Sequence, residues 1–311
     1  MNKELVINLL KYPISGKARS FIKNYKEQQC AKKFKLIMTI VCRNEEDIIE
    51  QSIRFHCAMG VDGVIVTSHK STDKTNEILE NLKQEGLVLE ILYKETPKHQ
   101  HHLWVNEMIK IAKNKYKADW TIDADADEFY YSHFLDLKKS IYEYSKNGIN
   151  ALWVGSTFCF PQDDINFTDN IYFERLNYIN AEKPDEYPQV KCLKSIHNTK
   201  DFISSTDGNH FVEMKNQKQV FCANITLYHY MMRDYKSWEA KVLRWIDSAQ
   251  YLKKHQIGHI QPMIDLYKEG KLKEEYNRLY NNNIRDDKLN NGYLYIDKNI
   301  SIFMKHKELT K

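Results

Sequence analysis

Residues 34–122 alternate short apolar segments with amphipathic ones, and this pattern constrains the fold more than any other feature. The segments FKLIMTIV, DGVIVTS, LVLEILY and ADWTI are apolar and rich in β-branched residues, which is typical of buried strands. The three segments between them begin near Glu45, Ser71 and His101 and carry apolar residues at helical spacing. This alternation predicts an α/β fold with a mostly parallel central sheet flanked by helices.

The ends of these helices can also be predicted from the sequence. Asn44 is expected to cap the first helix, and Gly86 is expected to end the second. In the third helix, Leu103, Met108 and Ile111 are expected to form the buried stripe.

The second half of the chain has a weaker pattern. ALWVGSTFCF, PQVKCLKSI and ANITLYHYMM are predicted strands, and KSWEAKVLRWIDSAQYLKK is a predicted helix with Trp238, Val242 and Trp245 on one face. We therefore expect a lead-in at 1–34, a catalytic domain at 35–235 and a helical C-terminal extension at 236–311. Within the catalytic domain, 35–131 is expected to bind the nucleotide and 132–235 the acceptor.

Composition and charge exclude several classes of protein. A net charge of +4 with 28% charged residues gives no sign of a nucleic-acid partner. The six cysteines are dispersed and form no CxxC pair, which fits a reducing compartment better than a disulfide framework. No stretch of about 18 apolar residues is present to span a membrane. The sequence therefore predicts a cytoplasmic protein, with peripheral contact at the inner membrane as a further expectation.

Three polar segments follow predicted strands, namely CRNEE, SHKSTDKT and DADADEF. In an open parallel sheet the ligand lies beyond the carboxyl ends of the strands, where these segments should meet. The segment TIDADADEF is the most informative, because its carboxylates repel one another unless a cation lies among them.

Three kinds of site were compared for these carboxylates. A calcium loop fails, because Glu128 and Phe134 stand where such a loop needs glycine and glutamate. A phosphatase-like aspartate would be followed by a small residue or a hydroxyl rather than by Glu-Phe. A Mg²⁺ or Mn²⁺ site that uses Asp125 and Asp127, with phosphate oxygens as further ligands, fits best. A solvated acidic turn is the non-functional alternative, and Asp123 is expected to be structural.

These segments resemble a family 2-type, GT-A fold bacterial glycosyltransferase, whose motif reads D-x-D-E-F after a W-x-I strand. The matching residues are CRNEE, STDKT and DWTIDADADEF, and GNHFV and HYMMRDYKSWEAK match more loosely. The close match covers Lys35–Tyr131, about a third of the chain. The resemblance implies a nucleotide-sugar donor, in the first place a UDP-sugar, and Mn²⁺ or Mg²⁺ bridging its diphosphate. It further implies an inverting transfer to a cell-surface glycan such as lipopolysaccharide or capsule.

The resemblance and the residue chemistry together give the candidate site residues. Asp125 and Asp127 are the expected metal ligands, with His210 or His229 as a third, and Glu128 supports the site or acts on the acceptor side. Contacts to the donor are expected from residues at or after the ends of the predicted strands and from residues further along the chain. These residues are Cys42, Asn44, Glu45, Ser68, Asp73, His101, Arg233 and Lys241. Ser68 stands where the family often has an aspartate that contacts uracil, so GDP- and CMP-sugars stay open as donors.

Each of these residues also has a structural interpretation. Asn44 and Asp73 suit helix capping, and the histidines of KHQHH suit a loop before a helix better than a metal cluster. Asp207 is the candidate catalytic base, chosen over Asp163, Asp164 and Glu174 because it lies beside the GNH turn. A metal-dependent nucleotidyl- or phosphotransferase and a non-catalytic carbohydrate-binding protein are the rival functions.

Overall fold

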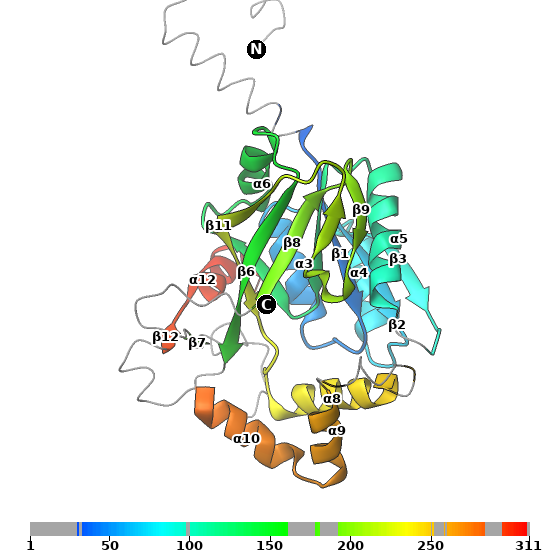
Figure 1. Ribbon diagram of the computed structural model, residues 1–311, viewed down its shortest axis with the longest axis vertical. Helices are drawn as coiled ribbons and strands as arrows, with labels where there is room; N and C mark the ends of the chain where they lie inside the picture. Colours follow the sequence, from blue (N-terminus) through cyan, green and yellow to red (C-terminus); the bar gives the residue numbers. More distant parts are fainter. Residues whose placement is uncertain are drawn as a thin grey trace, which may run out of the picture.

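The computed structural model describes residues 30, 33–97, 100–160, 178–180, 192–249, 251, 258, 260–283 and 294–309. A central sheet is covered by helices, and a group of C-terminal helices lies beyond its lower edge (Figure 1). The predicted fold class is therefore confirmed. The lead-in predicted at 1–34 lies almost wholly outside the described residues.

The N-terminal half of the sheet is parallel. Its strands are β1 (Leu36–Cys42), β2 (Val64–His69), β3 (Val88–Lys94) and β4 (Trp120–Asp125), in the order β4-β1-β2-β3. The helices α3 (Ile49–Ala58), α4 (Thr75–Gln84) and α5 (His101–Asn114) connect these strands. Because the strands run in the same direction, the loops after β1, β2 and β4 meet at one edge of the sheet.

The other half of the sheet is mixed. Strand β8 (Cys192–Asn198) pairs antiparallel with β4 and with β6 (Ala151–Phe160), and β11 (Gln219–His229) pairs parallel with β6. Strand β5 (Glu128–Ser132) follows β4 after two residues and pairs antiparallel with β11. A separate hairpin of β9 (Phe202–Ser205) and β10 (Val212–Met214) encloses the 3₁₀ turn η1 (Asp207–Asn209).

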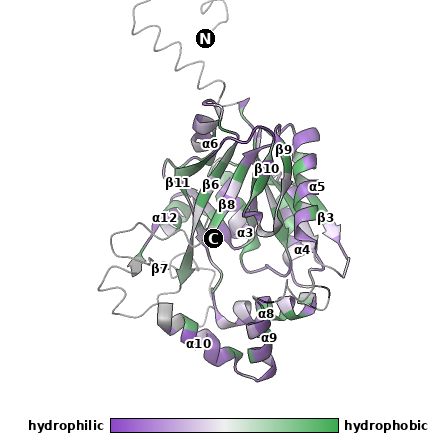
Figure 2. Ribbon diagram, viewed as in Figure 1, coloured by the Kyte–Doolittle hydropathy of each residue, from purple (hydrophilic) through white to green (hydrophobic). Residues whose placement is uncertain are grey.

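Alternate residues of β1 face two different hydrophobic layers. Leu36, Met38 and Ile40 pack with the buried residues of α3 and α4, whereas Ile37 and Val41 pack with those of α5. Successive side chains of a strand point to opposite faces, so helices on both faces explain why β1 is apolar at every position. Figure 2 shows the hydrophobic residues concentrated in the central strands.

Two predictions about the helices are wrong and one is confirmed. Asn44 has a φ of 54°, and α3 begins five residues later, so Asn44 cannot cap it. Leu103 is 50% exposed; the buried residues of α5 are Trp104, Val105, Met108, Ile109 and Ala112. Gly86 does end α4, with a φ of 82° that glycine adopts without strain.

The C-terminal segment is largely helical, as predicted. Helices α8 (Tyr235–Ala249), α9 (Gln261–Lys268) and α10 (Leu272–Asn283) pack together around Trp238, Val242 and Tyr276. Strand β12 (Leu294–Ile296) then joins the sheet through β7 (Tyr178–Asn180), and α12 (Asn299–His306) packs into the main core. None of the described helices combines the length and the apolar character needed to cross a bilayer. Helix α6 (Leu137–Ser145), which the sequence pattern did not predict, follows β5.

Candidate active site

A two-residue turn between β4 and β5 holds the carboxylates that the sequence singled out. Strand β4 ends at Asp125, Asp127 lies in the turn, and β5 begins at Glu128. The carbonyl oxygen of Asp127 accepts a hydrogen bond from the backbone N–H of Tyr230 at 2.9 Å, which fixes the turn against the chain after β11. The carboxylates therefore lie at the edge where the sheet predicts a ligand.

Asp123 is turned into the protein interior and is 2% exposed. Its carboxylate accepts a hydrogen bond from the Thr39 hydroxyl on β1 and lies 3.3 Å from Nε2 of His197 on β8. Asp123 thus links β4 to β1 and β8, which is a structural role.

Asp125 is the more open of the two expected metal ligands, with 40% of its side chain exposed. Its Oδ1 lies 3.7 Å from Nε2 of His101, the first residue of α5, and its Oδ2 lies 3.9 Å from Nζ of Lys194. Burial raises the pKa of this carboxyl, but Lys194 and His101 outweigh that effect and bring the pKa below its usual range. Asp125 is therefore ionised at neutral pH and accessible to a ligand.

Asp127 is enclosed by cations of the chain itself. Its Oδ2 accepts a hydrogen bond from Nζ of Lys241 at 2.9 Å and lies 3.7 Å from Nη1 of Arg233. Its Oδ1 lies 3.4 Å from Nε2 of His229. Burial raises the pKa of Asp127, and these neighbours, Lys241 first among them, nevertheless hold it well below the usual range.

Glu128 is fully buried and supports the turn. Its Oε2 accepts a hydrogen bond from the backbone N–H of Asp125 at 3.0 Å, and its Oε1 lies 2.9 Å from Nζ of Lys194. Glu128 thus positions Asp125 and, through Lys194, β8. Because Glu128 is fully buried, its carboxylate is not exposed to a ligand, which fits a supporting role.

Glu45 links the loop after β1 to the chain around α8. Its carboxylate accepts hydrogen bonds from Arg233 at 3.0 Å and from Arg244 at 2.8 Å, and Arg233 also bonds Asp47 at 2.8 Å. Since Arg233 is also near Asp127, the first and fourth strand ends share one buried cation.

Two of the expected donor contacts hold loops together. Asn44 Oδ1 accepts a hydrogen bond from the backbone N–H of Thr72 at 2.7 Å, which joins the loop after β1 to the loop after β2. Asp73 accepts hydrogen bonds from the backbone N–H groups of Thr75 and Glu46, at 3.0 and 3.1 Å. Asp73 therefore turns the chain into α4, as the capping interpretation expected.

Ser68 and Cys42 lie beneath this edge. Ser68 is 1% exposed, and its hydroxyl donates to Oδ1 of Asn76 at 2.6 Å, so it presents no free group to a nucleotide base. Cys42 is 4% exposed, and burial raises the pKa of its thiol well above the usual range. Both residues support the loops, and the structure does not bring them to the carboxylates.

The η1 turn is tethered to the same region. Nδ2 of Asn209 donates to the carbonyl oxygens of Asp123 at 3.3 Å and Ser195 at 2.7 Å. His210 Nδ1 lies 3.1 Å from the carbonyl oxygen of Leu193, so this imidazole is held against β8. The backbone of Asp207 opens the turn, and the orientation of its carboxylate lies outside what the structure describes.

The donor set suits a divalent cation, but the chain's own cations already contact it. Carboxylate oxygens with an imidazole nitrogen are suitable ligands for Mn²⁺, and Nε2 of His229 is buried without a hydrogen bond to any described residue. Among the described residues, however, no three His, Cys, Asp or Glu side chains are grouped closely enough to hold a metal as they stand. Repulsion by a bound ion would favour movement of Lys241 and Arg233 away from Asp127.

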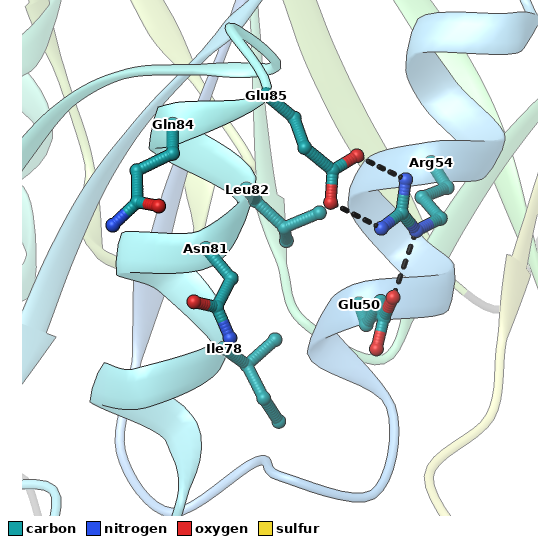
Figure 3. A pocket seen from close by; sticks show the side chains of 7 residues that line it. All are labelled: Glu50, Arg54, Ile78, Asn81, Leu82, Gln84 and Glu85. Atoms are coloured by element: carbon teal, nitrogen blue, oxygen red, sulfur yellow. Dashed lines mark hydrogen bonds and ion pairs between the residues drawn. The ribbon is translucent and has the colours of Figure 1, made fainter.

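A hollow of about 460 Å³ lies elsewhere, between α3 and α4 (Figure 3). Arg54 crosses it, with hydrogen bonds to both carboxylate oxygens of Glu85 at 2.7 and 2.8 Å and to Glu50 at 2.8 Å. The residues that line it are Glu50, Arg54, Ile78, Asn81, Leu82, Gln84 and Glu85. None of the carboxylates around β4 is among them, so this hollow is separate from the site.

Sequence reasoning missed three residues of the site, namely Lys194, Arg244 and Asp47. Lys194 lies between Leu193 and Ser195 in the predicted strand PQVKCLKSI, and a lysine inside a strand could have been marked as a paired side chain. Arg244 follows Lys241 by three residues and therefore lies on the same side of α8. No comparable signal distinguishes Asp47.

A mostly parallel sheet with carboxylates at the edge after its fourth strand defines an α/β protein with a candidate ligand site at that edge. The chain belongs to glycosyltransferase family 92, whose sequence profile matches residues 38–266. The earlier resemblance was to a family 2-type enzyme, and the family that matches is family 92. A comparison with curated proteins gives no match.

Solved structures resemble the chain at low identity. Staphylococcus aureus TarS residues 1–349, also solved with UDP, shares 12% identity over 73% of this chain and 69% of that chain, with a TM-score of 0.41. Glucosyl-3-phosphoglycerate synthase from Mycobacterium tuberculosis, solved with Mn²⁺, UDP and phosphoglyceric acid, shares 18% identity. That similarity covers 42% of this chain and 45% of that chain, with a TM-score of 0.28.

Proposed function

We propose that the chain transfers a sugar from a nucleotide-diphosphate donor, in the first place a UDP-sugar, to a cell-surface glycan such as lipopolysaccharide or capsule. The observation that carries the donor proposal is the partly exposed carboxylate of Asp125, with the Lys194 ammonium and the His101 imidazole beside it, at the carboxyl edge of the sheet. Negative and positive groups together suit a metal–diphosphate, which presents charges of both signs.

Asp125 and Asp127, with His229 as the third ligand, are the residues that would hold Mn²⁺ or Mg²⁺. When bound, such an ion supplies Lewis-acid stabilisation to the leaving diphosphate. His101, Lys194, Lys241 and Arg233 surround the same place and would neutralise the phosphate charge that grows as the glycosidic bond breaks. Glu128 keeps Lys194 in position, and Glu45 keeps Arg233 in position.

For the acceptor hydroxyl, we propose Asp207 as the base of an inverting reaction. Its turn is anchored two residues later by Asn209 to the backbone of Asp123, two residues before Asp125. This bond ties η1 to β4, which supports Asp207 as the residue that accepts the hydroxyl proton. Asp207→Asn should lower kcat with little change in the affinity for UDP; unchanged kcat would exclude Asp207 as the base.

The donor proposal is tested with a panel of UDP-, GDP- and CMP-sugars, measured with Mn²⁺ and with EDTA. We expect one class of donor to be turned over, with release of the nucleotide, and EDTA to abolish the reaction. Release of a sugar 1-phosphate from a UDP- or GDP-sugar would instead identify a nucleotidyltransferase. Full activity in EDTA would contradict the metal role while leaving transfer itself intact.

The location of the enzyme is part of the same proposal. A glycan acceptor that is assembled on a lipid carrier would place the enzyme at the cytoplasmic face of the inner membrane. Trp238 and Trp245 do not support direct insertion, since both pack against the helices of the C-terminal group. Flotation with liposomes that contain anionic lipid tests this contact, and no flotation would exclude it.

A further inference from the structure

Helix α8 reaches the site through three ion pairs. Lys241 bonds Asp127 at 2.9 Å, Arg244 bonds Glu45 at 2.8 Å, and Asp247 accepts a hydrogen bond from Arg43 at 2.8 Å. The helix lies beyond the lower ends of the strands, as Figure 1 shows. Of these three pairs, only Lys241 contacts an expected metal ligand directly.

Asp125 and Asp127 are not equivalent in this arrangement. Asp125 lies 3.7 Å from His101 and 3.9 Å from Lys194, and its side chain is 40% exposed. Asp127 is 5% exposed and is hydrogen-bonded by Lys241. A cation that binds both carboxylates would bring a second positive charge onto the buried Asp127 carboxylate beside the Lys241 ammonium, and the repulsion between the two favours movement of the ammonium away.

The charges around the turn are already almost balanced. Five carboxylates, Asp125, Asp127, Glu128, Glu45 and Asp47, are in ion pairs with four cations, Lys194, Lys241, Arg233 and Arg244. A divalent ion that binds alone would change the small net negative charge of these groups into a net positive charge, in surroundings that are largely buried. A diphosphate that enters with it carries a negative charge on each phosphate and restores the balance.

We propose that Lys241 occupies the place of the divalent ion on Asp127 while no donor is bound and moves to the diphosphate when the donor arrives. This inference rests on the proposed function, because it concerns the metal and the nucleotide of that same site. Its consequence is that metal and nucleotide diphosphate bind together, each raising the affinity for the other by the same factor. Lys241 is thus a positioning residue that couples the two.

The test measures binding of Mn²⁺ by electron paramagnetic resonance of the free ion, with and without UDP, and with GDP as a second nucleotide. In the unmodified enzyme, Mn²⁺ should bind at least about tenfold more tightly with the nucleotide than without it. Lys241→Met keeps the length of the side chain and removes its charge. It should raise the affinity for Mn²⁺ alone at least about tenfold and reduce the effect of the nucleotide accordingly.

Two controls test whether the gain in affinity for Mn²⁺ depends on the Lys241–Asp127 ion pair. Lys236→Met removes the same charge from an exposed position on α8 and should bind Mn²⁺ like the unmodified enzyme. Adding Asp127→Asn to Lys241→Met should abolish the gained affinity. Thermal melting confirms that each variant is folded, and Lys241→Gln is the substitute if the methionine variant is not.

The outcomes separate the two proposals. Equal affinity of the unmodified enzyme for Mn²⁺ with and without nucleotide, or no gain in Lys241→Met, would overturn the role of Lys241 and leave the proposed function intact. Failure to bind Mn²⁺ or either nucleotide, alone or together, would overturn the proposed function and this inference with it.

Discussion

Asp125 and Asp127 are separated by one residue, and their different surroundings predict different effects of the same substitution. Asp125 is partly exposed and lies 3.9 Å from Lys194, whereas Asp127 is buried and hydrogen-bonded by Lys241. Both carboxylates are ionised at neutral pH, because nearby cations outweigh the effect of burial on their pKa. Loss of the Asp125 charge should mainly weaken ligand binding. Loss of the Asp127 charge should in addition lower the stability of the protein.

Asp125→Asn should lower kcat/KM at least about 100-fold and lower the free energy of unfolding by less than about 1 kcal/mol, because its carboxylate is partly exposed and its ion pairs with His101 and Lys194 are long. Asp127→Asn should cause a similar loss of activity and also destabilise the protein by about 1–3 kcal/mol, since it leaves buried cations without their counter-charge. Steady-state kinetics and urea unfolding measure the two effects. Asp265→Asn, at an exposed position on α9, is the control. Equal stability of both site variants would contradict the distinction.

Helix α3 is attached to β5 through a buried histidine. Nδ1 of His56 lies 2.7 Å from the carbonyl oxygen of Ser52, and its Nε2 accepts a hydrogen bond from the backbone N–H of Tyr130 at 3.0 Å. Accepting that bond requires a neutral ring, so Nδ1 carries the proton and donates it to Ser52. Burial lowers the pKa of His56 from 6.5 to about 3, which the backbone bond to Ser52 offsets only in part.

This pairing predicts how stability depends on pH. Below pH 6.5 the unfolded chain takes up a proton on His56 that the folded chain refuses until about pH 3. The free energy of unfolding should therefore fall as the pH falls through this window, by up to about 1.4 kcal/mol per pH unit. Urea unfolding between pH 7 and 5 measures the slope, and His56→Gln should reduce it. An identical slope in the variant would assign the effect to other groups.

The C-terminal end of the chain completes the main core, although it follows a separate group of helices. The Phe303 ring on α12 lies 5.3 Å from that of Phe55 on α3 and is 3% exposed. Strand β12 joins the sheet edge just before α12. The sheet and its core are therefore completed by residues more than 200 positions from the first strand.

Phe303→Ala should lower the free energy of unfolding by about 3–5 kcal/mol, because it leaves a cavity in the core between α3 and α12. Ile302→Ala, the neighbouring position at 62% exposure, should change it by no more than about 0.5 kcal/mol. Denaturant unfolding of both variants measures the difference. A similar small effect at both positions would show that α12 is not part of the core.

The sequence by itself determined the parallel half of the sheet and the place of the site. The apolar strands and helical spacing of residues 34–122 are local patterns, and local patterns fix both the elements and the edge at which their loops meet. The mixed half, in which strand pairing joins distant segments, had no such signal; β5, β12 and α6 were missed for this reason.

Only the tertiary structure decided what each polar side chain does. Ser68 and Asn44 hold loops together, whereas Lys194 and Arg244, which no motif marked, pair with the carboxylates of the site. Ion pairs act between atoms a few ångströms apart, and those partners here lie as much as 199 residues apart in the chain. The spacing of residues along a sequence carries no record of such distances, so charge pairing at the site had to come from the fold.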